Sequence, residues 1–251
     1  MVSCDQINAL INVSSIEELW DLHTQQMARY GFDRILYGVT HYRTSTSLGD
    51  PDDFIVLTNH DREYTDLYIG EGLYAHAPMV RWALEHEGAC SWSVLRRMLD
   101  TGALSEGERR VLEFNRCQGV TAGYSISFKS ISKRSKGAIA LTGRHGLDQA
   151  AVDAIWSEHG EEILALNNIA HLRIQTLPYK TEKRSLTRRQ REVLGWVGDG
   201  KTIQDIALLL SLNPATVEKH LRLAREALGV ETTAQAVLKA SFQNQMFVLD
   251  L

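Results

Sequence analysis

Residues 186–245 read LTRRQREVLGWVGDGKTIQDIALLLSLNPATVEKHLRLAREALGVETTAQAVLKASFQNQ and contain four helix-start signals. Three are capping boxes, in which a threonine hydroxyl and a side chain three residues later bind free backbone N–H groups, at Thr187, Thr202 and Thr232. The fourth combines Asn213, a favourable N-cap, with Pro214, which suits a first helical turn because its missing N–H is not needed there. Gly200 and Gly229 follow the first and third helices, where a left-handed residue is common. The stretch therefore predicts four short helices.

The third of these helices has two different faces. Apolar residues recur at spacings of four, three and four and form one narrow stripe of Val217, Leu221, Ala224 and Leu228. The other face carries cationic and hydrogen-bonding side chains, namely Lys219, His220, Arg222 and Arg225. A helix held by such a stripe, with its polar face outward, is suited to enter the major groove of DNA.

The same stretch resembles a known family of DNA-binding domains. Its pattern LTxRQREVLxWVxxGKTxxDIAxxLxLxxxTVEKHLxxAxxxLGVxxxxQAV is similar to the LuxR or GerE type of helix-turn-helix. The resemblance implies double-stranded DNA as a partner, with base contacts from Glu218 and Arg222 and phosphate contacts from Lys219, Arg225 and Arg189. Thr216 and His220 complete the expected DNA-binding set. Gln190 replaces the usual glutamate, which predicts only a small loss of stability because glutamine keeps the capping bond without the favourable charge.

Composition places the protein among ordinary globular chains of one or two domains, with 251 residues, 44% of them hydrophobic. The net charge of −4 is unevenly distributed: residues 180–251 hold 11 Lys and Arg against 8 Asp and Glu, whereas residues 1–179 hold 16 against 23. The basic part is thus the helix-turn-helix part, as phosphate binding requires. Cys4, Cys90 and Cys117 lack paired spacing and fit reduced thiols. With no leader and no membrane-length apolar run, we expect a cytoplasmic protein with no membrane partner.

The first part of the chain alternates between helix and strand signals. Strands are predicted where β-branched and aromatic residues gather, at 32–42, 54–58, 120–128 and 136–143. Helices are predicted from capping and periodicity at 15–30, from a cap at Asn59 through Tyr64 and Tyr68, at 78–86, at 105–117 and at 147–174. This order favours an α+β fold, an α-β-α sandwich sensor domain with an antiparallel sheet, followed by an all-α four-helix helix-turn-helix domain. The predicted boundaries are 1–174 for the sensor, 175–185 for a linker and 186–251 for the DNA-binding domain.

Residues 58–92 resemble the ligand pocket of LuxR-type quorum sensors, in which an acyl-homoserine lactone is the signal ligand. Tyr64, Tyr68, Pro78 and Trp92 stand at the spacings of that pattern. The resemblance implies that the two tyrosines donate hydrogen bonds to the carbonyl groups of the ligand and that Trp92 forms a wall beside the lactone ring. Ser125 is expected on the same side of the sheet as this pocket.

Ala77 departs from the family pattern, because it stands where the family has an aspartate that accepts the amide N–H of the ligand. An alanine side chain cannot accept a hydrogen bond, and a buried donor without a partner costs on the order of 1–3 kcal/mol. Three alternatives follow: His76 or a backbone carbonyl replaces the acceptor, the native ligand differs, or the protein needs no ligand. A regulator that binds DNA independently of ligand is therefore the main alternative function.

Dimerisation is expected because a helix-turn-helix protein usually reads a two-fold site as a homodimer. The helix 147–174 is the predicted contact, with Leu164, Leu166 and Ile169 either at the interface or in the core behind it. RNA polymerase is a further candidate partner implied by the resemblance.

The sequence offers little support for an enzyme. HExxH, CxxC, GxSxG and glycine-rich phosphate loops do not occur, and the nine histidines are scattered. We expect no catalytic residues, no metal and no cofactor. A phosphorylation-driven response regulator would begin with a strand ending in paired acidic residues, whereas this chain begins with a polar turn and a helix.

Overall fold

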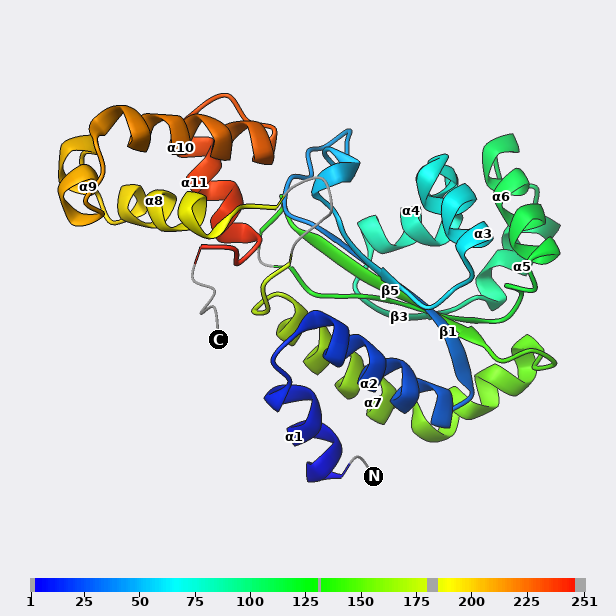
Figure 1. The fold of residues 1–251 in the computed structure, drawn as a ribbon. Coiled ribbons are helices and arrows are strands. Elements are labelled where there is room, and N and C mark those ends of the chain that lie inside the picture. Colours follow the sequence, from blue (N-terminus) through cyan, green and yellow to red (C-terminus); the bar gives the residue numbers. More distant parts are fainter. Residues whose placement is uncertain (1–2, 131, 180–184, 247–251) are drawn as a thin grey trace. The chain divides into compact units, whose positions relative to one another are not determined.

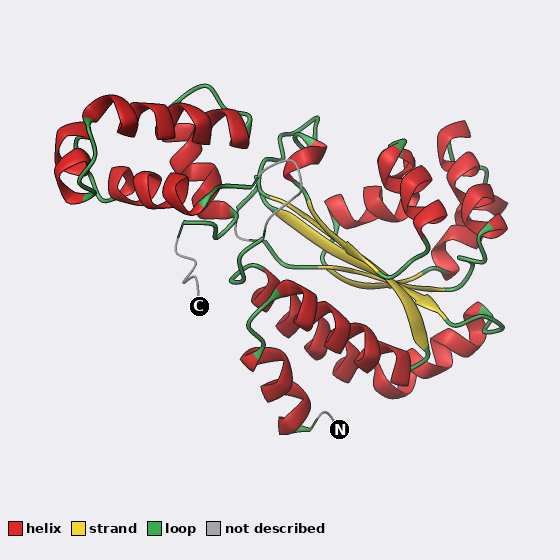
Figure 2. Cartoon of the chain, in the orientation of Figure 1, coloured by secondary structure: helices red, strands yellow, loops and turns green. Residues whose placement is uncertain are grey.

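The computed structural model describes residues 3–130, 132–179 and 185–246. The chain forms two compact units, Met1–Arg173 and Ile174–Leu251. All the described strands belong to the first unit, and the second is helical (Figure 2). Of the predicted linker, residues 180–184 lie outside the described residues, so its boundaries stay a prediction.

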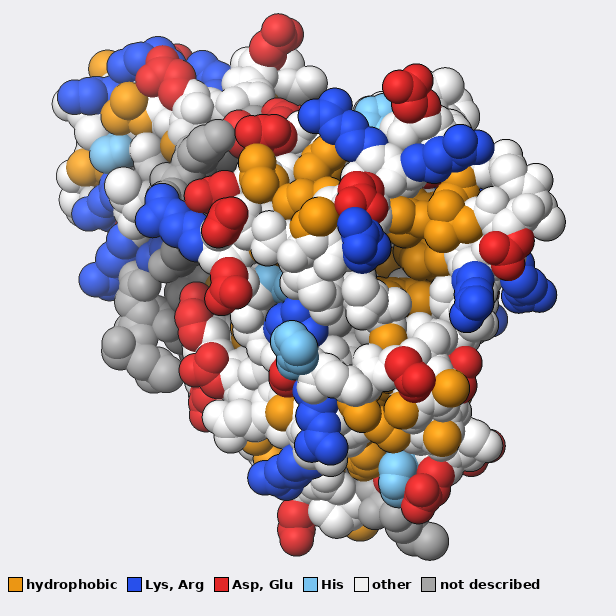
Figure 3. Space-filling view, turned by 90° about the vertical axis from the view of Figure 1, so that its right-hand side faces the viewer, with side chains coloured by type: hydrophobic (Ala, Val, Ile, Leu, Met, Phe, Trp, Pro, Cys, Tyr) orange, Lys and Arg blue, Asp and Glu red, His pale blue; other side chains and the backbone are white. Residues whose placement is uncertain are grey.

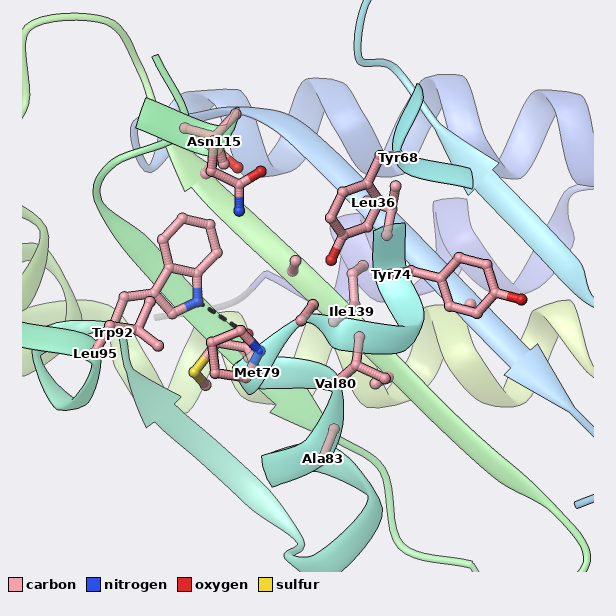
Figure 4. A pocket seen from close by; sticks show the side chains of 18 of the residues that line it. Leu36, Tyr68, Tyr74, Met79, Val80, Ala83, Trp92, Leu95, Asn115 and Ile139 are labelled. Carbon is pink, nitrogen blue, oxygen red and sulfur yellow. Dashed lines mark hydrogen bonds between the residues drawn. The ribbon is translucent and has the colours of Figure 1, made fainter. Parts of the chain in front are cut away.

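The first unit is built on a five-stranded antiparallel sheet in the order β2-β1-β5-β4-β3. Its strands are β1 Phe32–Thr40, β2 Ile55–Thr58, β3 Gly88–Ser91, β4 Gly123–Ser127 and β5 Lys136–Gly143. Successive side chains of a strand point to opposite faces. On β1, Tyr37 is buried against helices, whereas its neighbour Leu36 faces a cavity on the other side (Figure 4).

Helices cover both faces of this sheet (Figure 1), which confirms the predicted sandwich. One face carries α2 Ile16–Arg29 and α7 Gln149–Ile174, with α1 Cys4–Asn12 beside them. The other carries α3 Arg62–Thr65, a π-helical turn at Asp66–Gly70, α4 Pro78–Glu85, α5 Ser93–Asp100 and α6 Glu106–Cys117. Short 3-10 turns lie at Pro51–Asp53 and Leu73–His76.

Two polar contacts fix α7 against the rest of the unit. Tyr37 Oη lies 2.8 Å from His171 Nδ1, and His23 Nε2 lies 3.0 Å from Asn167 Oδ1. Burial lowers the pKa of both histidines to about 4, so both rings are neutral at pH 7. The α7 side of the sheet is thereby a closed core, which leaves the opposite face for a binding site.

Four features differ from the sequence prediction. Strand β3 and helices α1 and α5 were not predicted. The predicted cap at Asn59 is wrong: its Oδ1 accepts from the Ile35 N–H at 2.6 Å and its Nδ2 donates to the Asp33 carbonyl at 2.8 Å. Asn59 thus ties the end of β2 to β1, and α3 begins after Asp61 without a side-chain cap.

The second unit contains α8 Arg188–Gly198, α9 Ile203–Leu209, α10 Pro214–Leu228 and α11 Thr233–Phe242. The three predicted capping boxes and the Asn213 cap are all present, and Gly229 is left-handed with φ of 63°. Gln190 Oε1 accepts from the Thr187 N–H at 2.8 Å, so the glutamine keeps the reciprocal bond.

Apolar packing joins these four helices. The predicted stripe of α10 is fully or almost fully buried and meets residues from α8, α9 and α11, including Val193, Leu194, Ile206, Ala236 and Ala240. The polar face of α10 is therefore turned outward. Across both units, none of the described helices has the length and apolar character needed to cross a membrane.

Candidate ligand pocket and nucleic-acid interface

A cavity of about 960 Å³ lies in the first unit, between the sheet and the segments that run from α3 to α6. Figure 3 shows a hollow on this side of the unit in which hydrophobic side chains gather and charged side chains form the edge. All five ligand residues predicted from the sequence line this cavity: Tyr64, Tyr68, Ala77, Trp92 and Ser125. The structure thus brings together residues that are up to 61 positions apart.

Tyr64 and Tyr68 lie on successive helical turns, which places their rings on one face. The ring centroids are 5.2 Å apart, and Phe114 stacks on Tyr64 at 5.3 Å. The Tyr64 hydroxyl donates to Asn115 Oδ1 at 3.1 Å, whereas the Tyr68 hydroxyl has no partner among the described residues. Burial raises the pKa of both tyrosines, so each remains a protonated donor at pH 7.

Trp92 and Ser125 form the second polar group of the cavity. The indole Nε1 donates to Ser125 Oγ at 2.9 Å (Figure 4), and both side chains are buried. Trp92 packs directly over Gly123, where an added Cβ would lie 2.9 Å from the indole ring and 2.3 Å from the Leu141 carbonyl oxygen. The ring can therefore reach the cavity only because residue 123 has no side chain.

Ala77 is buried and directly precedes Pro78 at the start of α4. Its methyl group brings no hydrogen-bonding atom to the cavity. His76 is exposed, and its ring lies beside Gly107 of α6, where an added Cβ would be 3.2 Å from His76 Nδ1. Since His76 does not line the cavity, its predicted role as a replacement acceptor has no geometric support.

Asn115 and His60 are among the polar residues that line the cavity and were not predicted. Asn115 lies near the end of α6 and reaches Tyr64 across 51 positions of sequence, a pairing that no local pattern signals. His60 stacks on Tyr64 with 4.4 Å between ring centroids. Burial, with Arg34 nearby, lowers the pKa of His60 to about 4, so this ring is also neutral.

The candidate DNA interface lies on α10 of the second unit. Glu218, Lys219 and Arg222 are exposed, and Lys219 has no partner among the described residues. Arg222 Nη1 donates to Glu226 Oε1 at 2.5 Å, one turn along the same helix. Because this ion pair is exposed, it contributes little free energy, and the Arg222 guanidinium can leave Glu226 to bind a base or a phosphate.

The remaining side chains predicted to contact DNA are half-buried or hydrogen-bonded to other protein groups. Arg225 is half-buried and donates to Thr233 Oγ1 of α11 at 3.0 Å, and His220 is also half-buried. Thr216 donates from its hydroxyl to the Asn213 cap at 2.9 Å. On α8, Arg189 pairs with Glu192 at 2.6 Å. Arg225 and Thr216 therefore also hold the ends of α10 in place.

Other chemistry is sparse in the part of the chain that the structure describes. No group of three or more His, Cys, Asp or Glu side chains is arranged to hold a metal ion there. Cys4, Cys90 and Cys117 are free thiols, with burial raising the pKa of Cys90.

Two family models match this chain. Residues 15–174 match the autoinducer binding domain, and residues 184–240 match the bacterial regulatory proteins of the luxR family. The transcriptional activator protein BjaR1 of Bradyrhizobium diazoefficiens is 32% identical over 221 residues, covering 84% of this chain and 82% of that protein. AnoR of Acinetobacter nosocomialis, also a transcriptional activator protein, is 23% identical over 240 residues, covering 94% and 95%.

Solved structures share the fold. The crystal structure of Escherichia coli SdiA has a TM-score of 0.52 at 16% identity and covers 97% of both chains. CepR2 from Burkholderia cenocepacia, described as an N-acylhomoserine lactone dependent LuxR family transcription factor, has a TM-score of 0.51 at 19% identity and covers 67% of this chain and 90% of its own.

Proposed function

Because the chain belongs to the LuxR family of transcriptional regulators, we propose that it senses an acyl compound in the cavity and binds a two-fold operator as a homodimer. Its autoinducer-binding domain precedes its helix-turn-helix domain. The family is one of regulators, not of enzymes. Acyl-homoserine lactones are the ligand class that the sequence resemblance implies. The division into sensor, linker and DNA-binding domain at residues 174 and 186 belongs to the same proposal.

The observation that carries this proposal is the unpaired hydroxyl of Tyr68 inside a largely apolar cavity. Buried donors are normally paired, so a free one facing a space of ligand size points to an acceptor supplied by a ligand. Asn115 and the Trp92–Ser125 pair add polar groups to the same cavity, and Leu36, Val80 and Ile139 supply apolar walls (Figure 4). This arrangement suits a molecule with a carbonyl-bearing head and a hydrocarbon tail.

Thermal unfolding of the full chain with acyl-homoserine lactones of graded chain length tests this function. SdiA, which shares the fold, has been solved in complex with octanoyl-rac-glycerol, so that compound is included as a second probe. We expect a rise in melting temperature with at least one of them and a change in DNA affinity with the same compound. Unchanged melting and DNA binding with every probe would favour the ligand-independent alternative.

Arg222→Ala is expected to weaken binding to the operator by about 1–3 kcal/mol while changing binding to random DNA little, because an arginine that reads guanine carries sequence information. Lys219→Ala should instead weaken both and reduce the salt dependence by about one charge, because an exposed lysine without a partner is suited to a phosphate. The measurement is fluorescence anisotropy at several salt concentrations, with an operator selected from random DNA. Equal losses on both DNAs for Arg222→Ala would contradict its assignment to a base. The other predicted DNA residues, including Glu218, keep their proposed roles until they are tested in the same way.

Leu172→Glu is expected to shift the protein from dimer to monomer. Leu172 lies on the outer face of α7 and is 65% exposed, beside the exposed Ala165 and Asn168. Leu164 and Ile169 are half-buried at the edges of this face, whereas Leu166 is fully buried and belongs to the core. Sedimentation equilibrium measures the change, with Leu208→Glu as a matched control at an exposed leucine of α9. If Leu172→Glu formed a dimer of unchanged affinity, α7 would not be part of the dimer interface.

Contact with RNA polymerase stays a prediction.

A further inference from the structure

We propose that the cavity selects an acyl compound whose linkage to its head group accepts hydrogen bonds but donates none, an ester or a ketone in preference to an amide. This inference rests on the proposed function, in which an acyl molecule occupies the cavity. It concerns the atom that joins the acyl chain to the head group, and it follows from the donors and acceptors that the cavity presents.

Donors are available in the cavity. The Tyr68 hydroxyl and the Asn115 Nδ2 group both lack a protein partner among the described residues, and both point into the cavity (Figure 4). Ser125 receives the bond from Trp92, which leaves its own hydroxyl hydrogen for a ligand. Three neutral donors therefore face this space, enough for the carbonyl oxygens of an acyl group and of a head group.

The side-chain carboxylate and amide oxygens described next already accept hydrogen bonds from protein donors. Asn115 Oδ1 accepts from Tyr64, and the Glu113 carboxylate pairs with Arg116. Asp153 Oδ1 accepts from the Ser91 hydroxyl and from Gln149 Nε2. Each of these acidic or amide oxygens lines the cavity and already has a donor. The buried Ala77 adds only a methyl group at the start of α4.

His60 is the strongest competitor for a donor on the ligand. Its ring is neutral, so one ring nitrogen can accept a hydrogen bond. It also stacks on Tyr64. His60→Phe keeps an aromatic ring for this stack and removes the nitrogen, which makes it the control variant for the acceptor.

Unless it reaches His60, an amide N–H group in the cavity would find no free ring nitrogen or carboxylate among the side chains described above. An unsatisfied buried donor lowers affinity by about fivefold to 100-fold relative to a compound of the same shape that lacks the donor. An ester or a ketone keeps the carbonyl and removes that donor. The methyl group of Ala77 should therefore discriminate against amides.

Calorimetry on the full chain with three matched compounds tests this inference. They are N-octanoyl-homoserine lactone, the ester in which oxygen replaces the N–H, and the ketone in which CH2 replaces it. For the unmodified protein we expect the ester and the ketone to bind at least about fivefold more tightly than the amide. Ala77→Asp and Ala77→Asn should remove or reverse this preference, because each supplies an acceptor. The asparagine variant does so without a buried charge, which guards against a variant that fails to fold.

The results separate the two proposals. A preference for the amide in the unmodified protein, or a preference unchanged in a folded Ala77→Asn variant, would overturn the inference and leave the proposed function intact. Loss of amide binding alone in His60→Phe would show that His60 accepts the N–H, and would also overturn it. Failure of all three compounds to bind the unmodified protein would instead reject the proposed acyl ligand.

Discussion

Replacing Val217 with aspartate is expected to unfold the four-helix unit and to abolish DNA binding. Val217 is completely buried on the stripe by which α10 contacts the other helices. An uncompensated buried charge costs about 3–5 kcal/mol. A unit of this size has a free energy of unfolding on the order of 3–10 kcal/mol, so the substitution removes most of its stability.

Leu208→Asp is the matched control, because Leu208 is 81% exposed on α9 and the same new charge would remain in water. Its free energy of unfolding should stay within about 0.5 kcal/mol of the unmodified protein. Urea unfolding followed by circular dichroism, together with binding to random DNA, measures both variants. A stable, DNA-binding Val217→Asp protein would show that α10 is not held by this stripe.

The helix-turn-helix unit could be predicted almost completely from sequence because its signals are local. Thr187, Thr202 and Thr232 each form a capping bond within three residues, and Gly229 ends α10 in the left-handed conformation that favours glycine. Each of these contacts is made within one helical turn. The orientation of α10 then follows from which of its side chains are apolar.

The sheet was harder to predict, since part of it depends on partners distant in sequence. Strand β3 reads GACS, with no β-branched or aromatic residue, and it forms by pairing with β4 over the register Gly88↔Ser127 to Ser91↔Tyr124. Asn59 resembles a helix cap locally, but its amide is taken by the backbone of β1. In both places tertiary contacts override the local pattern.

In the pocket, too, contacts between residues close in sequence could be predicted, whereas contacts between distant residues could not. The spacing of Tyr64 and Tyr68 predicts that they share a face, and their stacked rings agree with it. That Asn115 takes the Tyr64 hydroxyl while Tyr68 stays unpaired depends on how α6 packs, which the sequence pattern does not contain. Only the structure therefore shows which hydrogen-bonding groups of the cavity are paired within the protein and which are available to a ligand.

Gly123→Ala is expected to destabilise the sensor unit and to weaken ligand binding together. The new Cβ would lie 2.3 Å from the Leu141 carbonyl oxygen and 2.9 Å from the Trp92 ring, both closer than van der Waals contact allows. Because Leu141 lies on the neighbouring strand β5, either the β4–β5 pairing or the position of Trp92 must change. Overpacking of this kind costs about 1–3 kcal/mol, and more where backbone must move.

Displacement of Trp92 would also break its 2.9 Å bond to Ser125 and move one wall of the cavity, so affinity for the acyl ligand should fall with stability. Gly38→Ala is the control for the effect of an added methyl group on stability alone, since a Cβ on Gly38 of β1 meets no atom within 4 Å but Gly38 also lines the cavity. Denaturant unfolding and calorimetry should show a large loss for Gly123→Ala and little change in stability for Gly38→Ala. If Gly123→Ala were as stable as Gly38→Ala and bound ligand as well as the unmodified protein, the contact of Trp92 with residue 123 would not shape the pocket.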